Sequence, residues 1–267
     1  MREFAVGIVT YNRPRFAAKS VRAAAAAFLP LGAPLFVYND GSEPKYRGEY
    51  RRLSDRHPAV QFIEDPENHG VAYAKNRLLE KMLKDTDAEW LFLLEDDIIV
   101  KSAEAATEYI RIAEQQGEHH LSFAHHGDAN LGPPVDTDGE LNFYWHSVGA
   151  WTMFSRECLE TVGLLDENFQ NAWEHVEHEL RIIQAGLMPD SDAHRYPDAA
   201  GSEAWLSEIP ASIAKSSIRP RDDWQSSIIN GLRYWQENKP ETFEMLFGPG
   251  TPLEQYSRHT LALDIIC

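Results

Sequence analysis

Cysteine is scarce in this sequence, with Cys158 and Cys267 the only two in 267 residues. Two thiols cannot supply a disulfide framework or a cysteine zinc site, and so few suit a reducing compartment, so we expect a cytoplasmic protein. No apolar run approaches the length that spans a bilayer, and the first residues, Met1 to Phe4, lack a signal-peptide pattern. We therefore expect no transmembrane segment.

Basic residues are also in short supply. Lys and Arg number 25 against 42 Asp and Glu, which gives a formal net charge of −17. Binding to a nucleic-acid backbone draws mainly on Lys and Arg, so nucleic acid is an unlikely main partner. The negative charge does not exclude a nucleotide ligand, because a metal ion can screen the charge of its phosphates.

What the sequence does have is an acidic cluster after a strongly apolar stretch. Residues 90–94 are apolar, Glu95, Asp96 and Asp97 follow, and apolar residues resume at 98–100. The apolar run predicts a strand buried on both faces. Acids at the carboxyl end of such a strand lie where open α/β sheets bind ligands, and Mg²⁺ or Mn²⁺ shared with ligand phosphates is their simplest partner. A solvated acidic turn is the alternative.

The first hundred residues alternate between strand and helix patterns. Turn signals such as Asn12-Arg13-Pro14 and Asp40-Gly41-Ser42 separate the segments. The order predicts a doubly wound, mostly parallel sheet flanked by helices, with its strand-end loops on one edge. The expected strands are 4–10, 34–39, 60–64 and the stretch from 90. The expected helices begin at Pro14, Lys45 and Val71 and end near residues 30, 56 and 83.

The pattern changes after Val100. Residues 102–116 predict a helix with Ser102 as its N-cap, and 121–124 a strand. The polar stretch 125–140 reads as a loop or hairpin over the site, or as disorder. Aromatic segments 143–146 and 150–154 predict antiparallel strands whose rings form core or, alternatively, stack on sugar. We expect residues 1–200 to form one domain, with a donor half (1–100) and an acceptor half (101–200), and 201–267 to be a helical extension packed on it.

A second chemical element lies in residues 169–183. Glu174, His175, Glu177, His178 and Glu179 fall within six residues. A His in the first turn of a helix stays neutral more readily and can accept a proton near pH 7. A metal cluster and an exposed charged helix are the alternatives, and the His-Glu-x-x-His order of zinc hydrolases is absent.

Helical spacing divides this segment into two faces. One is an apolar stripe expected to face the core, and the other carries Glu174, His178 and Arg181. The stripe consists of Val176, Leu180, Ile183 and Leu187.

With these residues in view, the chain resembles the family 2 glycosyltransferases of the GT-A, nucleotide-sugar-binding fold. The resemblance covers roughly residues 3–187 and rests on five short pieces in the family's order. They are Val9-Thr10-Tyr11-Asn12-Arg13, Asn39-Asp40-Gly41-Ser42, the segment 68–76 ending in Lys75-Asn76, Glu95-Asp96-Asp97, and the segment 163–169 leading to Glu174-His175-x-Glu177.

The resemblance implies a role for each donor-side position. Asp97 would be the metal ligand for Mn²⁺ or Mg²⁺, and Glu95 or Asp96 would face the ribose or the sugar hydroxyls. Lys75 would meet the phosphates as a point charge, because it stands where the family usually has Arg. The remaining donor-binding positions are Thr10, Tyr11, Asn12, Arg13, Asp40 and Asn76.

The clearest departure concerns the general base. His175 stands where the family normally has Asp, so it becomes the candidate base, with Glu174 and Glu177 as the other catalytic candidates. A His from the tail often completes the metal site in this fold. His194 is the candidate here, with His178 as the second choice.

The sequence thus predicts a metal-dependent transferase that moves a sugar from a nucleotide-diphosphate donor, UDP-type first, to a carbohydrate or other hydroxyl acceptor, with inversion. One rival is a sugar nucleotidyltransferase, although residues 10–13 are not its glycine-rich first loop. The other is a non-catalytic nucleotide-sugar or carbohydrate-binding module.

Overall fold

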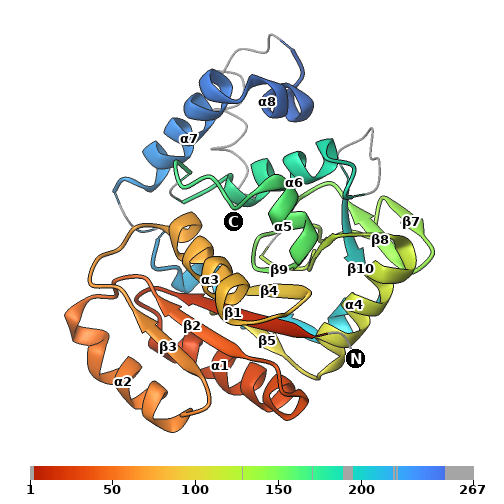
Figure 1. The fold of residues 1–267 in the computed structure, drawn as a ribbon. Helices are drawn as coiled ribbons and strands as arrows, with labels where there is room; N and C mark the ends of the chain where they lie inside the picture. Colours follow the sequence, from red (N-terminus) through yellow and green to blue (C-terminus); the bar gives the residue numbers. More distant parts are fainter. Residues whose placement is uncertain are drawn as a thin grey trace.

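A six-stranded sheet organises the chain. In the computed structural model, the described residues are 3–127, 129–169, 171–188, 195–218, 220 and 222–249. The strand order is β3-β2-β1-β4-β9-β6, with the first four parallel and β9 antiparallel to both neighbours (Figure 1). The strands are β1 (Phe4–Thr10), β2 (Leu35–Asn39), β3 (Gln61–Glu64), β4 (Trp90–Glu95), β6 (His120–Ser122) and β9 (Trp151–Ser155).

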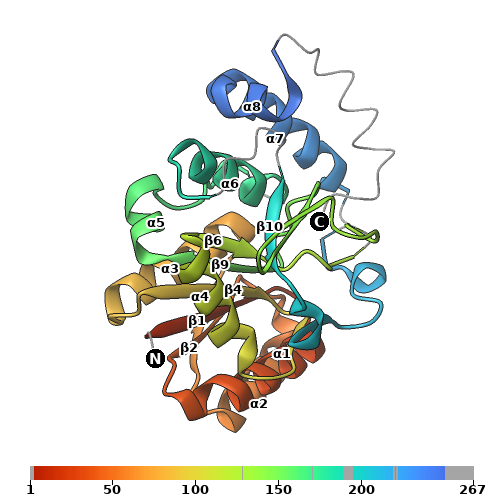
Figure 2. The same cartoon turned by 90° about the vertical axis from the view of Figure 1, so that its right-hand side faces the viewer.

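Helices cover both faces of this sheet, because its central strands are apolar on both sides. Phe4, Val6 and Ile8 of β1 share one core with α1 and α4, whereas Ala5 and Val9 share the second core with α3, α5 and α6. Figures 1 and 2 show α1 and α3 on opposite sides of the sheet. The helices are α1 (Pro14–Phe28), α2 (Arg47–Arg56), α3 (Val71–Asp85), α4 (Glu104–Gln116), α5 (Arg156–Val162), α6 (Glu174–Gln184), α7 (Trp224–Asn238) and α8 (Pro240–Phe247).

Two small antiparallel sheets complete the architecture. One has the order β10-β8-β7, and the other pairs β11 with β5. Residues from beyond 200 thereby reach the strand that follows the acidic cluster, since Leu206 pairs with Val100. The strands are β5 (Ile98–Val100), β7 (Asp136–Asp138), β8 (Leu141–Tyr144), β10 (Tyr196–Ala199) and β11 (Leu206–Glu208).

The predicted doubly wound, mostly parallel sheet with antiparallel additions is confirmed. The end of the fourth strand differs, because β4 stops at Glu95 and β5 belongs to another sheet. The predicted cap of α4 is also wrong, since Ala103 rather than Ser102 is its N-cap. The aromatic strands β8 and β9 pack in the core, and Trp151 of β9 is fully buried. Trp145, directly after β8, is 55% exposed. Among the described residues, no helix is long and apolar enough to cross a bilayer.

The prediction for residues 169–183 needs correction. The helix begins only at Glu174, because Trp173 before it has a left-handed backbone (φ 76°). The face expected to be polar packs towards the sheet, where His178 lies against Phe154. The apolar stripe instead packs into a third core with α7 and α8, which includes Leu180 and Trp235. Both faces of α6 are covered, so its acids Glu174, Glu177 and Glu179 are buried.

Candidate active site

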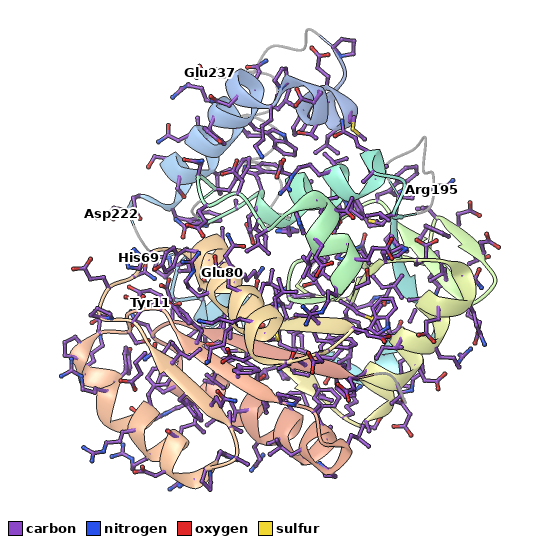
Figure 3. The ribbon with its side chains drawn as sticks, in the orientation of Figure 1. Tyr11, His69, Glu80, Arg195, Asp222 and Glu237 are labelled. Carbon is purple, nitrogen blue, oxygen red and sulfur yellow. The ribbon has the colours of Figure 1, made fainter. Side chains whose placement is uncertain are left out.

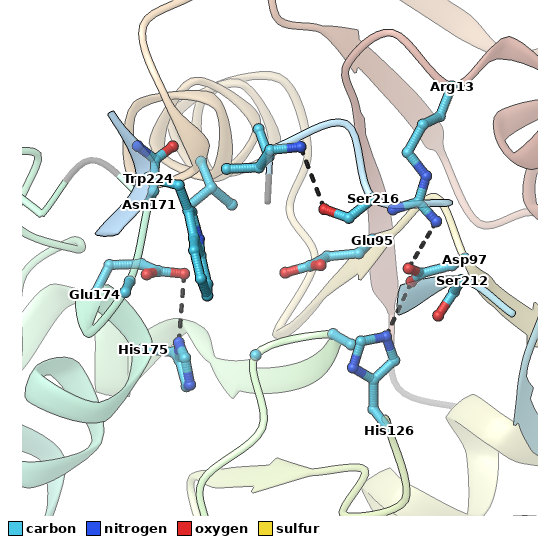
Figure 4. A pocket seen from close by; sticks show the side chains of 15 residues that line it. Arg13, Glu95, Asp97, His126, Asn171, Glu174, His175, Ser212, Ser216 and Trp224 are labelled. Atoms are coloured by element: carbon cyan, nitrogen blue, oxygen red, sulfur yellow. Dashed lines mark hydrogen bonds and ion pairs between the residues drawn. The ribbon is translucent and has the colours of Figure 1, made fainter. Parts of the chain in front are cut away.

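A pocket opens at the carboxyl edge of the parallel strands. It has about 780 Å³ of empty space and is open to solvent. Its wall comes from the ends of β1 and β4, the start of α6, and the segment 212–224 that follows β11 (Figure 4). Of the predicted site residues, Arg13, Glu95, Asp97, Glu174 and His175 line it.

One wall is the acidic cluster, which is buried and paired. Arg13 Nη2 lies 2.9 Å from Asp97 Oδ2, and its Nη1 lies 3.4 Å from Asp96 Oδ1. Thr10 donates a 2.6 Å hydrogen bond to Asp96 Oδ2. Asp96 therefore lies below the pocket wall, and Asp97 is the carboxylate that reaches it.

Burial and neighbouring charges separate the two aspartates. Burial, with the adjacent Asp97 charge adding to it, raises the pKa of Asp96 to about 7 despite the opposing effect of Arg13. Burial acts in the same direction on Asp97, but contact with His126 and Arg13 outweighs it and lowers the pKa of Asp97 to about 2. The pocket therefore has a carboxylate at Asp97 that is ionised at neutral pH.

His126 is the imidazole beside that carboxylate. Its Nε2 lies 3.3 Å from Asp97 Oδ1 and 3.8 Å from Glu208 Oε1. Burial opposes its protonation, but contact with Asp97 raises the pKa of His126 to about 9. Glu208 also accepts a 2.8 Å hydrogen bond from Gly127 N and a bond from Ser212, so it ties segment 212–224 to this wall.

The opposite wall carries His175 and Glu174, at the start of α6. His175 Nδ1 lies 3.4 Å from Glu174 Oε1, and Lys75 Nζ lies 3.2 Å from the same oxygen. Lys75 is 2% exposed and also binds Glu95 Oε1 and the carbonyl of Gly149, each at 3.1 Å. The Lys75 charge outweighs burial and holds the pKa of Glu174 well below its usual range.

Local backbone geometry sets this wall in place. Trp173 keeps its strained left-handed conformation because its Nε1 donates to the carbonyl of Ile228 and its ring packs on Trp235. Gly149 passes so close that an added Cβ would lie 3.0 Å from His175 Cγ and 3.0 Å from Lys75 Nζ. No side chain other than hydrogen fits at Gly149 without moving one of these neighbours.

Other predicted donor residues have structural partners. Asp40 accepts hydrogen bonds from the side chain of Asn68 and from the backbone of His69 and Gly70. Asn76 bridges α3 to the backbone of Leu165. Neither lines the pocket as the structure describes it.

The loop after β1 is tied to the loop after β2. Asn12 exchanges hydrogen bonds with Glu43, and its backbone donates to Ser42. Figure 3 shows Tyr11, which is half-buried, at the edge where β1 ends. Donor contacts by Asp40, Asn76, Tyr11 and Asn12 stay predictions.

Three further predicted residues have structural partners in place of their expected roles, and a fourth lies outside the described residues. Lys75 is enclosed by carboxylates instead of facing a phosphate. Glu177 is fully buried and pairs with Arg181 and Lys239 at 2.9 Å each, so it is a structural anchor rather than a base. His178 is buried and contacts the carbonyl of Gly163, away from Asp97. His194 lies outside the described residues.

Sequence reasoning missed part of the wall. His126 was placed only in a general loop, although it follows β6, which runs parallel to β4 and ends at the same edge. Among the described residues of 125–140, His126 alone lines the pocket, and several lining residues come instead from the chain beyond β11. No sequence signal marked its lining residues. They are Ser212, Ser216, Ile218 and Trp224, with Asn171 beside them.

The residues present fit a divalent cation that is shared with a ligand. Asp97 Oδ1 and His126 Nε2 are buried without a well-formed hydrogen bond, which leaves a carboxylate oxygen and an imidazole nitrogen together. Both are ligands that Mn²⁺ accepts, the imidazole once the cation displaces the proton on Nε2. The described residues contain no group of three or more His, Cys, Asp or Glu able to enclose a metal alone. A cation here would therefore complete its shell with ligand phosphates, as Mg²⁺ commonly does.

The fold is that of GT-A glycosyltransferases. A mannosyltransferase from Pyrobaculum calidifontis, solved with GDP-Man and Mn²⁺, has a TM-score of 0.59 at 13% identity over 98% of this chain and 79% of its own. S. aureus TarS 1–349 with UDP-GlcNAc has 0.56 at 12%, over 91% and 70%. GalNAc-T7, solved with UDP, GalNAc and Mn²⁺, has 0.60 at 12%, over 97% of this chain and 54% of its own.

The family assignment comes from the sequence. The family model Glycosyl transferase family 2 matches residues 5–120, which include the acidic cluster and every parallel strand up to β4. Residues 5–120, slightly less than half of the chain, therefore form a family 2 glycosyltransferase domain. No curated protein sequence matches the chain. The family match favours a transferase over the two rivals, a sugar nucleotidyltransferase and a non-catalytic binding module.

Proposed function

We propose that this transferase is metal-dependent and inverting, with Asp97 and His126 holding the cation and His175 acting as general base. The supporting observation is that the two sets of groups line opposite walls of one pocket (Figure 4). A donor whose diphosphate lies at Asp97 would present its anomeric carbon across the pocket towards His175. An acceptor hydroxyl attacking from that side displaces the diphosphate directly, which inverts the anomeric centre.

The chain's own groups prepare the proton transfer. Glu174 is ionised and only accepts hydrogen bonds, so it favours the His175 tautomer with the proton on Nδ1. Nε2 is then the atom that takes the acceptor proton as the new C–O bond forms and the bond to diphosphate breaks. When bound, Mn²⁺ or Mg²⁺ supplies positive charge that stabilises the departing diphosphate.

The donor would be a nucleotide-diphosphate sugar, UDP-type first. The structures of similar fold solved with UDP-GlcNAc and with GDP-Man support both classes as starting points. We also propose a cytoplasmic enzyme in which residues 201–267 complete the catalytic domain of 1–200, since Ser212, Ser216, Ile218 and Trp224 line the pocket.

Donor hydrolysis tests this proposal. The chain is incubated with a panel of UDP and GDP sugars, with Mn²⁺, with Mg²⁺ and with EDTA, and nucleoside diphosphate release is measured. We expect metal-dependent release with one donor, and the anomer of the product, read by NMR, to be inverted. Release that is equal in EDTA would overturn the metal role, and a retained anomer would overturn direct displacement.

A further inference from the structure

Part of the pocket wall around the candidate base is apolar, and its described lining includes the ring of a tryptophan. Trp224, the first residue of α7, lines the pocket together with Val71, Ala172 and Ile218. In Figure 4 the Trp224 ring stands beside Glu174 and His175 and faces Glu95 across the opening, on the side away from Asp97. This ring therefore borders the space from which an acceptor would reach His175.

The position of Trp224 is linked to that of the base. Ser227, one turn further along α7, accepts a 3.3 Å hydrogen bond from Asn171 and donates a 2.7 Å bond to the carbonyl of Trp224. Trp173 donates a 3.2 Å bond to the carbonyl of Ile228. The start of α7 is thus fastened to the loop that leads into His175, so the ring and the imidazole keep a fixed relation.

The charges of this region disfavour an anionic acceptor. The described lining includes the carboxylates Glu95, Asp97 and Glu174. Its guanidinium, Arg13, already pairs with Asp96 and Asp97. The nearby Lys75 is buried between Glu95 and Glu174. With a formal net charge of −17 for the chain, a phosphorylated or carboxylated acceptor would meet repulsion rather than a binding group.

We propose that Trp224 forms the acceptor subsite and that the acceptor is a neutral sugar, whose C–H face packs on the indole while a hydroxyl points to His175. An aromatic ring offers a large apolar face to the C–H groups of a sugar, and the few polar groups around it fix orientation. This inference builds on the proposed function and adds the chemical class of the acceptor. It assigns α7, in the carboxy-terminal extension, to substrate selection.

The test compares neutral and charged acceptors on matched variants. With the donor that the wild type hydrolyses, transfer is measured to maltotriose, chitotriose and mannotriose, and to glucose 6-phosphate and mannose 6-phosphate. We expect transfer to a neutral trisaccharide and none to the phosphates. Trp224→Ala should raise the acceptor KM about tenfold or more while donor hydrolysis stays within about twofold. Trp224→Phe should recover most of the affinity, and Trp145→Ala, at an exposed ring outside the pocket, should change nothing.

The possible results distinguish a failure of the proposed function from a failure of the acceptor subsite. A wild type that neither hydrolyses nor transfers any donor would overturn the proposed function, and the subsite with it. An active wild type with an unchanged acceptor KM in Trp224→Ala would overturn the subsite alone. Preference for the sugar phosphates would overturn the neutral acceptor. Loss of donor hydrolysis in both Trp224→Ala and Trp224→Phe, with circular dichroism unchanged, would assign the ring to the donor instead.

Discussion

Glu174 and His175 are neighbours in sequence and partners in space, with Oε1 of Glu174 3.4 Å from Nδ1 of His175. The same oxygen contacts the buried ammonium of Lys75. Lys75 thereby keeps Glu174 ionised, and Glu174 orients His175. In the proposed mechanism His175 is the base, and the buried Lys75–Glu174 pair holds its imidazole ready.

Glu174→Gln tests this relationship. The amide can donate to Nδ1, so the proton can move to Nε2 and the base loses its accepting atom. We expect kcat to fall by about 10²-fold, within the usual contribution of a general base, with donor affinity unchanged. Steady-state kinetics and donor titration measure the two quantities. An unchanged kcat would show that Glu174 does not orient the base.

Gly149→Ala should disturb the same wall by steric contact alone. The added Cβ would lie 3.0 Å from His175 Cγ and from Lys75 Nζ, so one of them must shift by a few tenths of an ångström. Misplacement on this scale lowers turnover, and we expect kcat to fall about tenfold or more with an unchanged melting profile. Gly132→Ala is the matched control, because nothing lies within 4 Å of a Cβ there. Equal kcat in both variants would contradict the proposed tightness of the wall.

Substituting the two proposed cation ligands, Asp97 and His126, should weaken metal-dependent donor binding to different extents. Asp97→Ala removes the ionised ligand, so Mn²⁺ should no longer increase donor affinity. His126→Ala removes the neighbouring nitrogen and should raise the Mn²⁺ concentration for half-maximal donor binding by about tenfold. Calorimetric donor titrations with and without Mn²⁺ measure both effects. Asp138→Ala, at an exposed acid on β7, is the control. If His126→Ala bound donor and Mn²⁺ as the wild type does, His126 would not be a ligand.

The sequence predicted the parallel half of the fold because each strand there has an unambiguous pattern. Seven buried residues of β1 and the apolar start of β4 are long runs bounded by turn residues, and parallel strands bring their ends to one edge. Arg13 and Asp97 could be placed together from that topology alone. His126 obeys the same rule, but β6 has only three residues and so gave a weak signal.

The α6 region could not be predicted, because its environment comes from distant segments. Periodicity gave the apolar stripe but not the helices that cover it, α7 and α8, nor the sheet beneath the other face. Glu177 was therefore a catalytic candidate in the sequence. Its partner Lys239 lies 62 residues further along the chain, and no local pattern connects the two.

Glu177→Gln should affect stability rather than catalysis. Glu177 is fully buried, and its removal as a charge leaves Arg181 and Lys239 without their shared carboxylate. Breaking a buried pair by neutralising one partner costs about 3–5 kcal/mol, partly relieved here because Lys239 also contacts Asp166. We expect a lower denaturation midpoint and a kcat within about threefold of the wild type at a temperature where both are folded. A kcat loss like that of Glu174→Gln would restore Glu177 as a catalytic candidate.

Glu118 gives the clearest pH dependence of stability outside the site. It is 7% exposed, and its Oε2 has no hydrogen-bond partner. Burial, with the charge of Asp138 adding to it, raises the pKa of Glu118 to about 8 from an ordinary 4.5. The folded state thus binds this proton more tightly than the unfolded chain does, so Glu118 makes the fold progressively less stable as pH rises from about 4.5 to about 8.

Glu118→Gln removes this titration, because the amide stays neutral at every pH. The variant and the wild type should melt alike near pH 5, and the variant should be more stable at pH 8 by about 1–3 kcal/mol, the usual cost of an unsatisfied buried polar group. Thermal unfolding from pH 5 to pH 8 measures the difference. Glu160→Gln is the control, since that side chain is 64% exposed and should give the same small offset throughout. A constant offset in Glu118→Gln as well would mean that Glu118 is already ionised in the folded protein at pH 5.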